Sequence, residues 1–192
     1  MEHEYLFALR DAIQSDTAVL KRETQRCFSK QNACATFLQL VEGEKQDAIP
    51  QEKFDDMTAS IVMLIDPVYN TAIYEDLKSS GNLKIISNID LRNSVISYYA
   101  DLYKTSSRIA DVAITTSYNE DFTDLLDVDE FSLDKEVSQT KIIGRIKKNE
   151  NTKLYLRRLQ KRIIIMRNTF IYQMLPKSLE LLDKINLEIS KK

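Results

Sequence analysis

YEDLKSSGNLKIISNIDLRNSVISYY, residues Tyr74–Tyr99, combines the end of one predicted helix with the start of another. Apolar residues before Gly81 recur at helical spacing, and Gly81 supplies the left-handed backbone conformation that commonly ends a helix. Ser87 stands three residues before Asp90, which predicts a capping box and places an acidic group in the first turn of the next helix. The stretch therefore predicts a helix, a short connector and a second helix, and it contains no catalytic motif.

The composition of the whole chain favours an all-α protein. Its 192 residues include only three Gly and three Pro, too few for the many tight turns of a β-sandwich or barrel. The length predicts one domain, residues 1–192. The 27 Lys and Arg residues nearly balance the 29 Asp and Glu residues. Because the resulting net charge is -2, we do not expect nucleic acid as the partner of the whole surface.

An apolar seam with seven-residue spacing occupies the first forty residues, and it predicts one long helix from Glu2 to about Val41. The neighbouring positions are apolar only near the two ends, so we expect the apolar face to be narrow in the middle. The seam consists of Leu6, Ile13, Leu20, Cys27, Cys34 and Val41, and the neighbouring positions are Leu9, Asp16, Glu23, Lys30 and Phe37.

Further apolar patterns predict shorter helices and a second long helical region. Short helices are expected at residues 54–65 and 71–79, and a longer one over Ile89–Ser117. The last helical region extends from about Val137 to Ser190, with a candidate interruption at residues 148–151 and a kink or break at Pro176. Together these segments predict an antiparallel helical bundle with long first and last helices.

The beginning of the chain bears on a membrane context. No run of about 18 apolar residues occurs, and the start has neither a charged n-region nor an apolar h-region, so no span or signal peptide is predicted within the chain. Met1 to Glu4 lead directly into helical periodicity without a capping residue. We expect a helix whose natural upstream segment is missing, with a native helix end that frays as the alternative.

A family resemblance rests on three stretches: EHEYLFALRDAIQSDTAVL, the Tyr74–Tyr99 stretch quoted above, and LYLRRLQKRIIIMRNTFIYQMLPKSLELLDKI. Together they resemble an uncharacterised bacterial family of small single-pass membrane-anchored helical proteins, a domain of unknown function. Typical members carry a basic N-terminus and one transmembrane helix directly before the position of Glu2, and this sequence lacks both. The resemblance implies an inner-membrane anchor upstream of this chain and, because a basic segment stays in the cytoplasm, a periplasmic bundle. It implies no established activity, ligand or catalytic residue.

Few residues suit catalysis or metal binding. His3, the only histidine, stands in the first helical turn, where nothing is expected to hold it as a general base or a metal ligand. Cys27 and Cys34 lie about 10.5 Å apart along a helix at 1.5 Å per residue, too far to pair with each other, and are expected in the core. If the domain is extracytoplasmic, an intermolecular disulfide through these cysteines is the second interpretation. No enzyme activity, cofactor or metal is predicted.

Two charged segments follow each other in the second half of the chain. Residues 120–136 carry eight acidic side chains against Lys135 alone, and a solvated face is favoured there over a calcium site because no Gly supplies the turn of an EF-hand loop. Residues 141–167 are strongly basic. They suit anionic lipid or nucleic acid, but docking against the acidic segment or plain solvation is the favoured interpretation. The candidate basic face consists of Arg157, Arg158, Lys161 and Arg162.

Tyrosines gather around the Tyr74–Tyr99 stretch and mark the candidate ligand or partner surface. A tyrosine has an apolar ring and a polar tip, which suits the end of a bundle where a pocket opens. Packing in the core with the hydroxyl bonded at the rim is the common alternative, and Arg92 is expected to brace this corner through Asp76 or Asp90. The candidate residues are Tyr74, Arg92, Tyr98, Tyr99 and Tyr103.

These observations predict a non-enzymatic sensing or protein-interaction module, anchored in the membrane through an upstream helix. Its partner is an unknown protein or small ligand, and two chains can also pair through the apolar seam. The first alternative is a cytosolic adaptor whose basic helix face binds nucleic acid or anionic lipid. A hydrolase or metalloenzyme is the second alternative.

Overall fold

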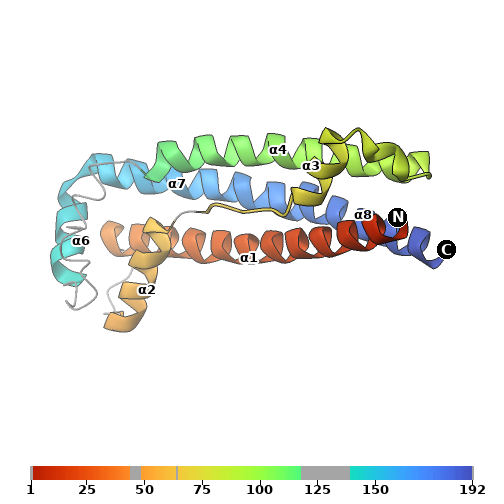
Figure 1. Ribbon diagram of the computed structural model, residues 1–192. Helices are drawn as coiled ribbons and strands as arrows, with labels where there is room; N and C mark the ends of the chain where they lie inside the picture. Colours follow the sequence, from red (N-terminus) through yellow and green to blue (C-terminus); the bar gives the residue numbers. More distant parts are fainter. Residues whose placement is uncertain (1, 44–48, 64, 118–138, 192) are drawn as a thin grey trace. The chain divides into compact units, whose positions relative to one another are not determined.

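The computed structural model describes residues 2–43, 49–63, 65–117 and 139–191, and every structural statement below refers to them. Helices account for most of this part of the chain, and no strand occurs in it (Figure 1). The α-helices are α1 (Glu2–Glu42), α2 (Gln51–Val62), α3 (Ala72–Ser79), α4 (Ile89–Ser117), α6 (Gln139–Lys148), α7 (Glu150–Thr169) and α8 (Leu175–Ser190). A short 3₁₀ helix, η1 (Asn82–Ile85), and a π-helical turn, η3 (Phe170–Met174), complete the set.

Helix α1 confirms the long first helix that the seven-residue period predicts. Every residue of the apolar seam is buried. The apolar face is narrow in the middle, as expected, but the buried face is wider than the apolar one, because Asp16, Glu23 and Lys30 are buried as well. The buried face of α1 is therefore wide along its whole length, and its middle is polar.

The Tyr74–Tyr99 stretch ends and restarts helices as predicted, but with a different cap. Gly81 follows α3 with φ +72°, in the left-handed region. Asn88, not Ser87, caps α4: its Oδ1 accepts the backbone N–H groups of Asp90 and Leu91, both at 3.1 Å. Ser87 instead donates its backbone N–H and its hydroxyl to the Glu2 carboxylate, at 2.8 and 2.9 Å. The predicted capping box does not form, because α4 begins at Ile89 and Asn88 occupies the capping position.

The last helical region is interrupted where the sequence indicates. Asn149 separates α6 from α7, and its Oδ1 accepts the N–H of Thr152 at 3.2 Å, capping α7. The π-helical turn η3 directly precedes the α8 segment that contains Pro176. Proline has no N–H to donate to the preceding turn, and a single π turn is a common way for a helix to continue past such a gap.

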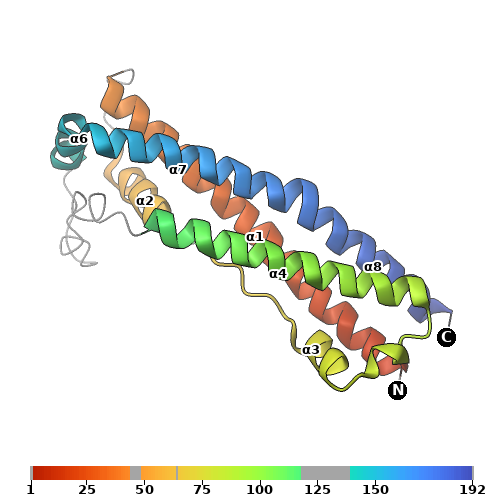
Figure 2. The same ribbon diagram turned by 90° about the horizontal axis from the view of Figure 1, so that it is seen from above.

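The chain divides into two compact units. The first comprises Met1–Thr24, Asp66–Ile109 and Asn168–Lys192. In it the start of α1 packs with α4 and α8, and both chain ends lie at the same end of this unit (Figures 1 and 2). Helix α8 runs antiparallel to α1. Helix α4 runs parallel to α1, because the connection through α3 returns the chain to the end where α1 begins.

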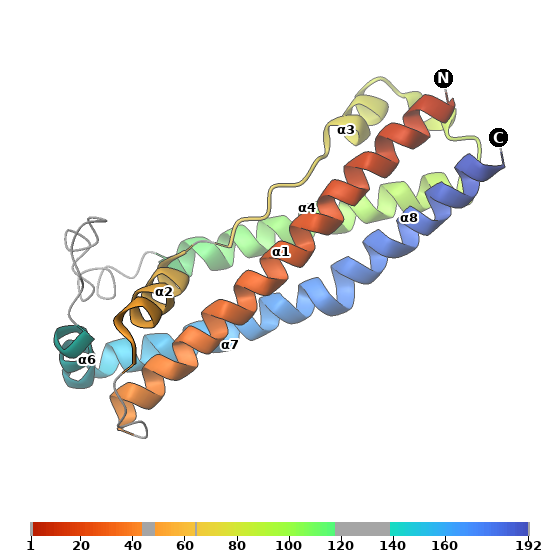
Figure 3. The same ribbon diagram turned by 90° about the horizontal axis from the view of Figure 1, so that it is seen from below.

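The second unit comprises Gln25–Ile65 and Ala110–Arg167. Here the later part of α1 packs against α2 and against the antiparallel helix α7 (Figure 3). Phe37 of α1 and Phe54 of α2 are in ring contact, with centroids 5.3 Å apart. Arg167 of α7 donates to the Gln31 side chain at 2.6 Å, and Arg157 pairs with Glu42. In both units the first helix packs against the last helical region, which confirms the predicted all-α architecture.

None of the helices in the described ranges is both long enough and apolar enough to cross a membrane. The acidic segment at residues 120–136 lies outside the described residues, so its expected docking against the basic segment stays a prediction.

Candidate functional site

A buried carboxylate organises the tyrosine corner of the first unit. Asp16 of α1 is fully buried. Its Oδ1 accepts the backbone N–H of Asn70 at 2.6 Å, and its Oδ2 accepts the Tyr98 hydroxyl at 3.4 Å. The Tyr99 hydroxyl donates to the carbonyl of the same Asn70, at 3.4 Å. The connection that precedes α3 is thus held between α1 and α4 by one carboxylate and two phenols.

The tyrosine rings form a continuous aromatic cluster. Tyr74 of α3 stacks on Tyr99 of α4, with centroids 4.3 Å apart and an interplanar angle of 11°. Tyr98 meets Tyr99 edge to face at 5.2 Å. Tyr103 lies 6.4 Å from Tyr74 and donates its hydroxyl to Glu75 Oε1 at 2.5 Å. Tyr74, Tyr98 and Tyr99 are buried and Tyr103 is 38% exposed. Three of the four predicted tyrosines therefore belong to the core, and only Tyr103 reaches the surface.

Burial controls the electrostatics of the cluster. It raises the pKa of Asp16 to about 6, although the hydrogen bonds from Asn70 and Tyr98 act in the opposite direction. Burial and the nearby Asp16 charge also raise the pKa of Tyr98 and of Tyr99. The Tyr69 hydroxyl is buried without a hydrogen-bond partner among the described atoms. The tyrosines thus stay protonated, and Asp16 is the group that titrates near neutral pH.

Arg92 does not brace this corner. Its side chain is half-buried on α4 and forms no hydrogen bond or ion pair with any residue that the structure describes. Asp76, one of its two expected partners, accepts the Tyr5 hydroxyl at 3.3 Å instead. The role predicted for Arg92 is therefore not observed.

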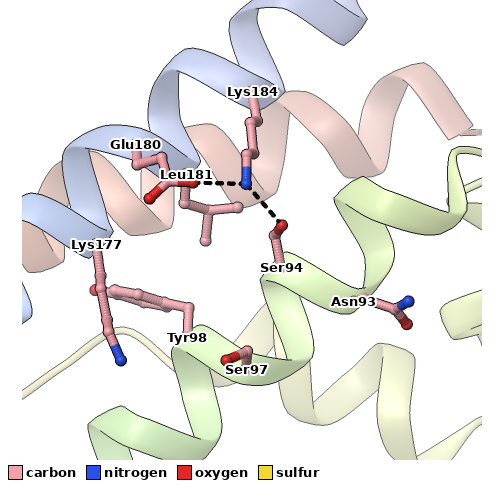
Figure 4. A pocket seen from close by; sticks show the side chains of 8 residues that line it. All are labelled: Asn93, Ser94, Ser97, Tyr98, Lys177, Glu180, Leu181 and Lys184. Carbon is pink, nitrogen blue, oxygen red and sulfur yellow. Dashed lines mark hydrogen bonds and ion pairs between the residues drawn. The ribbon is translucent and has the colours of Figure 1, made fainter.

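A groove between α4 and α8 opens beside the tyrosine cluster. It has a volume of about 340 Å³ and lies wholly within the first unit. The Lys184 ammonium lies 2.7 Å from Glu180 Oε1 and 3.1 Å from Ser94 Oγ (Figure 4), and Lys177 pairs with Asp101. We call this space the α4–α8 groove; its lining residues are Asn93, Ser94, Ser97, Tyr98, Lys177, Glu180, Leu181 and Lys184.

Tyr98 belongs to both features. Its ring lines the α4–α8 groove while its hydroxyl donates to Asp16 in the core. A ligand in the groove would therefore touch a side chain that is bonded to the buried carboxylate. Among the described residues that line the groove, Tyr98 is the one with a side-chain hydrogen bond to Asp16.

The candidate basic face lies on α7 in the second unit. All four of its side chains, Arg157, Arg158, Lys161 and Arg162, are exposed. Arg157 is partly neutralised by Glu42. The structure therefore leaves this face accessible to solvent.

The structure places the three residues that were considered, and set aside, for catalysis or metal binding: His3, Cys27 and Cys34. His3 is exposed and in edge contact with Phe7, at 4.7 Å between centroids. Cys27 and Cys34 are buried, which agrees with their predicted place in the core. Within the described ranges, no group of His, Cys, Asp and Glu side chains is placed to hold a metal ion.

Sequence reasoning missed the centre of the site. Asp16, Asn70 and the two lysines of the groove were not among the candidates. Asp16 did carry a signal, because an acidic residue at a position that should be apolar indicates a buried polar group with a specific role. Asn70 acts through its backbone, which no sequence pattern marks. Comparison with known proteins returns no match to a family model, to a curated protein or to a solved structure.

Proposed function

We propose that this protein is a non-enzymatic sensing or protein-interaction module that binds an acidic ligand, or an acidic segment of a partner, in the α4–α8 groove. The observation that carries the proposal is the double role of Tyr98, which lines the groove and is hydrogen-bonded to buried Asp16. A non-enzymatic role is favoured because the chain has a single histidine, at position 3.

The groove chemistry supports an acidic ligand. Lys177 and Lys184 are both exposed, and their carboxylate partners Asp101 and Glu180 are solvent-accessible. Exposed ion pairs of this kind contribute at most about 1 kcal/mol, so a ligand carboxylate can replace them at small cost. The hydroxyls of Ser94 and Ser97 add hydrogen-bonding groups beside the two ammonium groups. Binding there would press on the Tyr98 ring and change the environment of Asp16.

Site-specific photo-crosslinking in the source cells tests the groove. A photoreactive amino acid is placed at Ser97 in the groove, or at exposed Gln14 on α1 as a control. We expect a discrete adduct from position 97 only, and we expect the double variant Lys177→Glu/Lys184→Glu to abolish it. The matched charge reversal Lys21→Glu, at an exposed position of α1, should leave the adduct intact. Equal adducts from both label positions would exclude the groove as the binding surface.

We also propose that an upstream helix anchors the module in the inner membrane with the bundle in the periplasm. The support is the family resemblance of the three quoted stretches. Fractionation of the native full-length product, followed by protease treatment of intact spheroplasts, tests this arrangement. We expect membrane recovery and digestion of the bundle. Recovery in the soluble fraction would contradict the anchor.

The exposed basic face of α7 favours one alternative, a cytosolic adaptor for nucleic acid or anionic lipid. Such binding weakens steeply with salt, because phosphate contacts release counterions. The alternative requires that changing Arg157, Arg158, Lys161 and Arg162 to Gln abolishes binding to duplex DNA or anionic vesicles. Changing Lys147 and Lys148 of α6 to Gln is the control, since both are exposed and basic but lie outside this face.

A further inference from the structure

A second cavity lies in the other unit, between α1 and the end of α2. Its volume is about 270 Å³. Arg26, Ser29 and Lys30 line it from α1, and Ser60 and Met63 from the α2 side. We call it the Lys30 cavity. All of its lining residues belong to the second unit, so it is separate from the α4–α8 groove.

Lys30 is the unusual member of this lining. Its side chain is only 7% exposed, and its Nζ donates to the Met63 carbonyl at 2.7 Å. A carbonyl at a helix C-terminus is a favourable partner for a cation, but it accepts only one of the three ammonium protons. No carboxylate of the described residues lies within ion-pair distance of Lys30. Lys30 is thus a buried cation without a counter-charge.

The neighbouring Cys34 thiol does not supply that charge. Burial raises the pKa of the Cys34 thiol to about 12, so Cys34 stays neutral at physiological pH. Burial also lowers the pKa of Lys30, which reflects the cost of keeping an ammonium group away from water. A buried charge is normally paired, because desolvation is expensive without compensation.

None of the remaining lining residues carries a negative charge, and Gln25, Arg26, Ser29 and Ser60 have side chains that can donate hydrogen bonds. Arg26 is half-buried and contributes a guanidinium group. The hydroxyls of Ser29 and Ser60 have no hydrogen-bond partner among the described residues, so both can donate to a ligand. Because water occupies about 30 Å³ per molecule in the liquid, the cavity has room for a tetrahedral oxyanion and several waters.

From this arrangement, we propose that the Lys30 cavity binds a phosphate-class oxyanion, either free or as the phosphomonoester group of a small ligand. The anion supplies the counter-charge that Lys30 lacks and accepts hydrogen bonds from Arg26, Ser29 and Ser60. Two cationic groups with two hydroxyls suit a multiply charged tetrahedral anion better than a single carboxylate.

Calorimetric titration of the complete chain with inorganic phosphate, at constant ionic strength, tests the site. We expect Lys30→Met to weaken phosphate binding about tenfold or more, because a charge-assisted hydrogen bond is lost. Met keeps the length of the side chain while removing the buried charge, so the variant is expected to fold. Lys53→Met, on the exposed surface of α2, is the matched control and should bind as the wild type does.

Further titrations distinguish free phosphate from a phosphomonoester as the ligand, and the Lys30 cavity from the α4–α8 groove as the binding site. Ser60→Ala should weaken binding several-fold without lowering the unliganded Tm, since the Ser60 hydroxyl has no partner to lose. Tighter binding of glycerol 3-phosphate than of inorganic phosphate identifies a phosphomonoester; the reverse order identifies the free anion. The groove variant Lys177→Glu/Lys184→Glu should retain phosphate binding. No phosphate binding by the wild type, equal binding by Lys30→Met, or equally tight binding of acetate would overturn the proposal.

Discussion

Asp16 is a carboxylate that the fold keeps buried at a cost. It accepts two hydrogen bonds, from Asn70 and Tyr98, but it forms no ion pair with a described residue. Desolvation therefore dominates and raises its pKa from the ordinary value of 3.8 to about 6. The protonated form is favoured in the folded state, so between about pH 4 and about pH 6 the native protein binds more protons at Asp16 than the unfolded chain does.

Asp16→Asn should remove this pH dependence. Since one pKa unit corresponds to about 1.4 kcal/mol, the ionisation of Asp16 should lower the free energy of unfolding of the wild type by about 2 kcal/mol as the pH rises from about 4 to about 7. Asparagine stays neutral throughout and keeps an acceptor for the Asn70 N–H. Urea unfolding at both pH values should show that the free energy of unfolding of the variant increases relative to that of the wild type as the pH rises.

Asp183→Asn is the control for this measurement, because Asp183 is an exposed carboxylate on α8. Its free energy of unfolding should change with pH in the same way as that of the wild type. If Asp16→Asn also followed the wild type, the pKa of Asp16 would not be raised by burial, which would contradict this account.

At the scale of single elements, helix ends depend on one or two residues each. Gly81 ends the α3 region in the left-handed conformation, and Asn88 starts α4 through two backbone N–H groups. Asn88 also donates its side-chain amide to Glu188 of α8 at 2.7 Å. The Asn88 side chain thus both caps α4 and links α4 to α8.

Two glycine substitutions should change stability in opposite directions. Gly81→Ala should lower the free energy of unfolding by about 1 kcal/mol, because φ +72° is strained for a residue with a Cβ. Gly144→Ala, inside α6, should raise it by up to about 1 kcal/mol because Ala is the better helix former. At both positions an added Cβ would meet nothing within 4 Å, so backbone conformation alone separates them. Urea unfolding of the two variants checks the signs; equal shifts would contradict this account.

At the scale of the whole molecule, the apolar seam of α1 is buried by packing within the same chain. All six seam residues are buried, three in each unit. Two copies that paired through the seam would first have to expose these side chains to water, at a cost of about 25 cal/mol per Å² of apolar surface. Self-association, if it occurs, is therefore expected to use another surface.

Ile13→Ala should destabilise the fold without changing its oligomeric state. Ile13 is completely buried, so the cavity left behind should cost about 2–5 kcal/mol. The unfolding midpoint of the wild type and of the variant should be independent of protein concentration. Leu187→Ala is the control, since Leu187 is 59% exposed and should have little effect. A midpoint that rose with protein concentration for the wild type but not for Ile13→Ala would show that chains do pair through the seam.

Periodicity and breaker residues were sufficient to predict the helices. The long α1, the bounds of α4, the interruption near residue 149 and the irregular turn before Pro176 all follow from local signals. These features could be predicted because helical spacing, capping and the missing proline N–H act over a few neighbouring residues.

Tertiary structure alone decided which polar residues enter the core and which surfaces become sites. Asp16 is buried because an Asn70 backbone N–H and the Tyr98 hydroxyl reach it from other elements, 54 and 82 residues away in sequence. Ser87 donates to Glu2, 85 residues away in sequence, and the buried ammonium group of Lys30 donates to the carbonyl of Met63. Such pairings depend on long-range packing, which a single sequence records only as a polar residue at a position where an apolar one is expected.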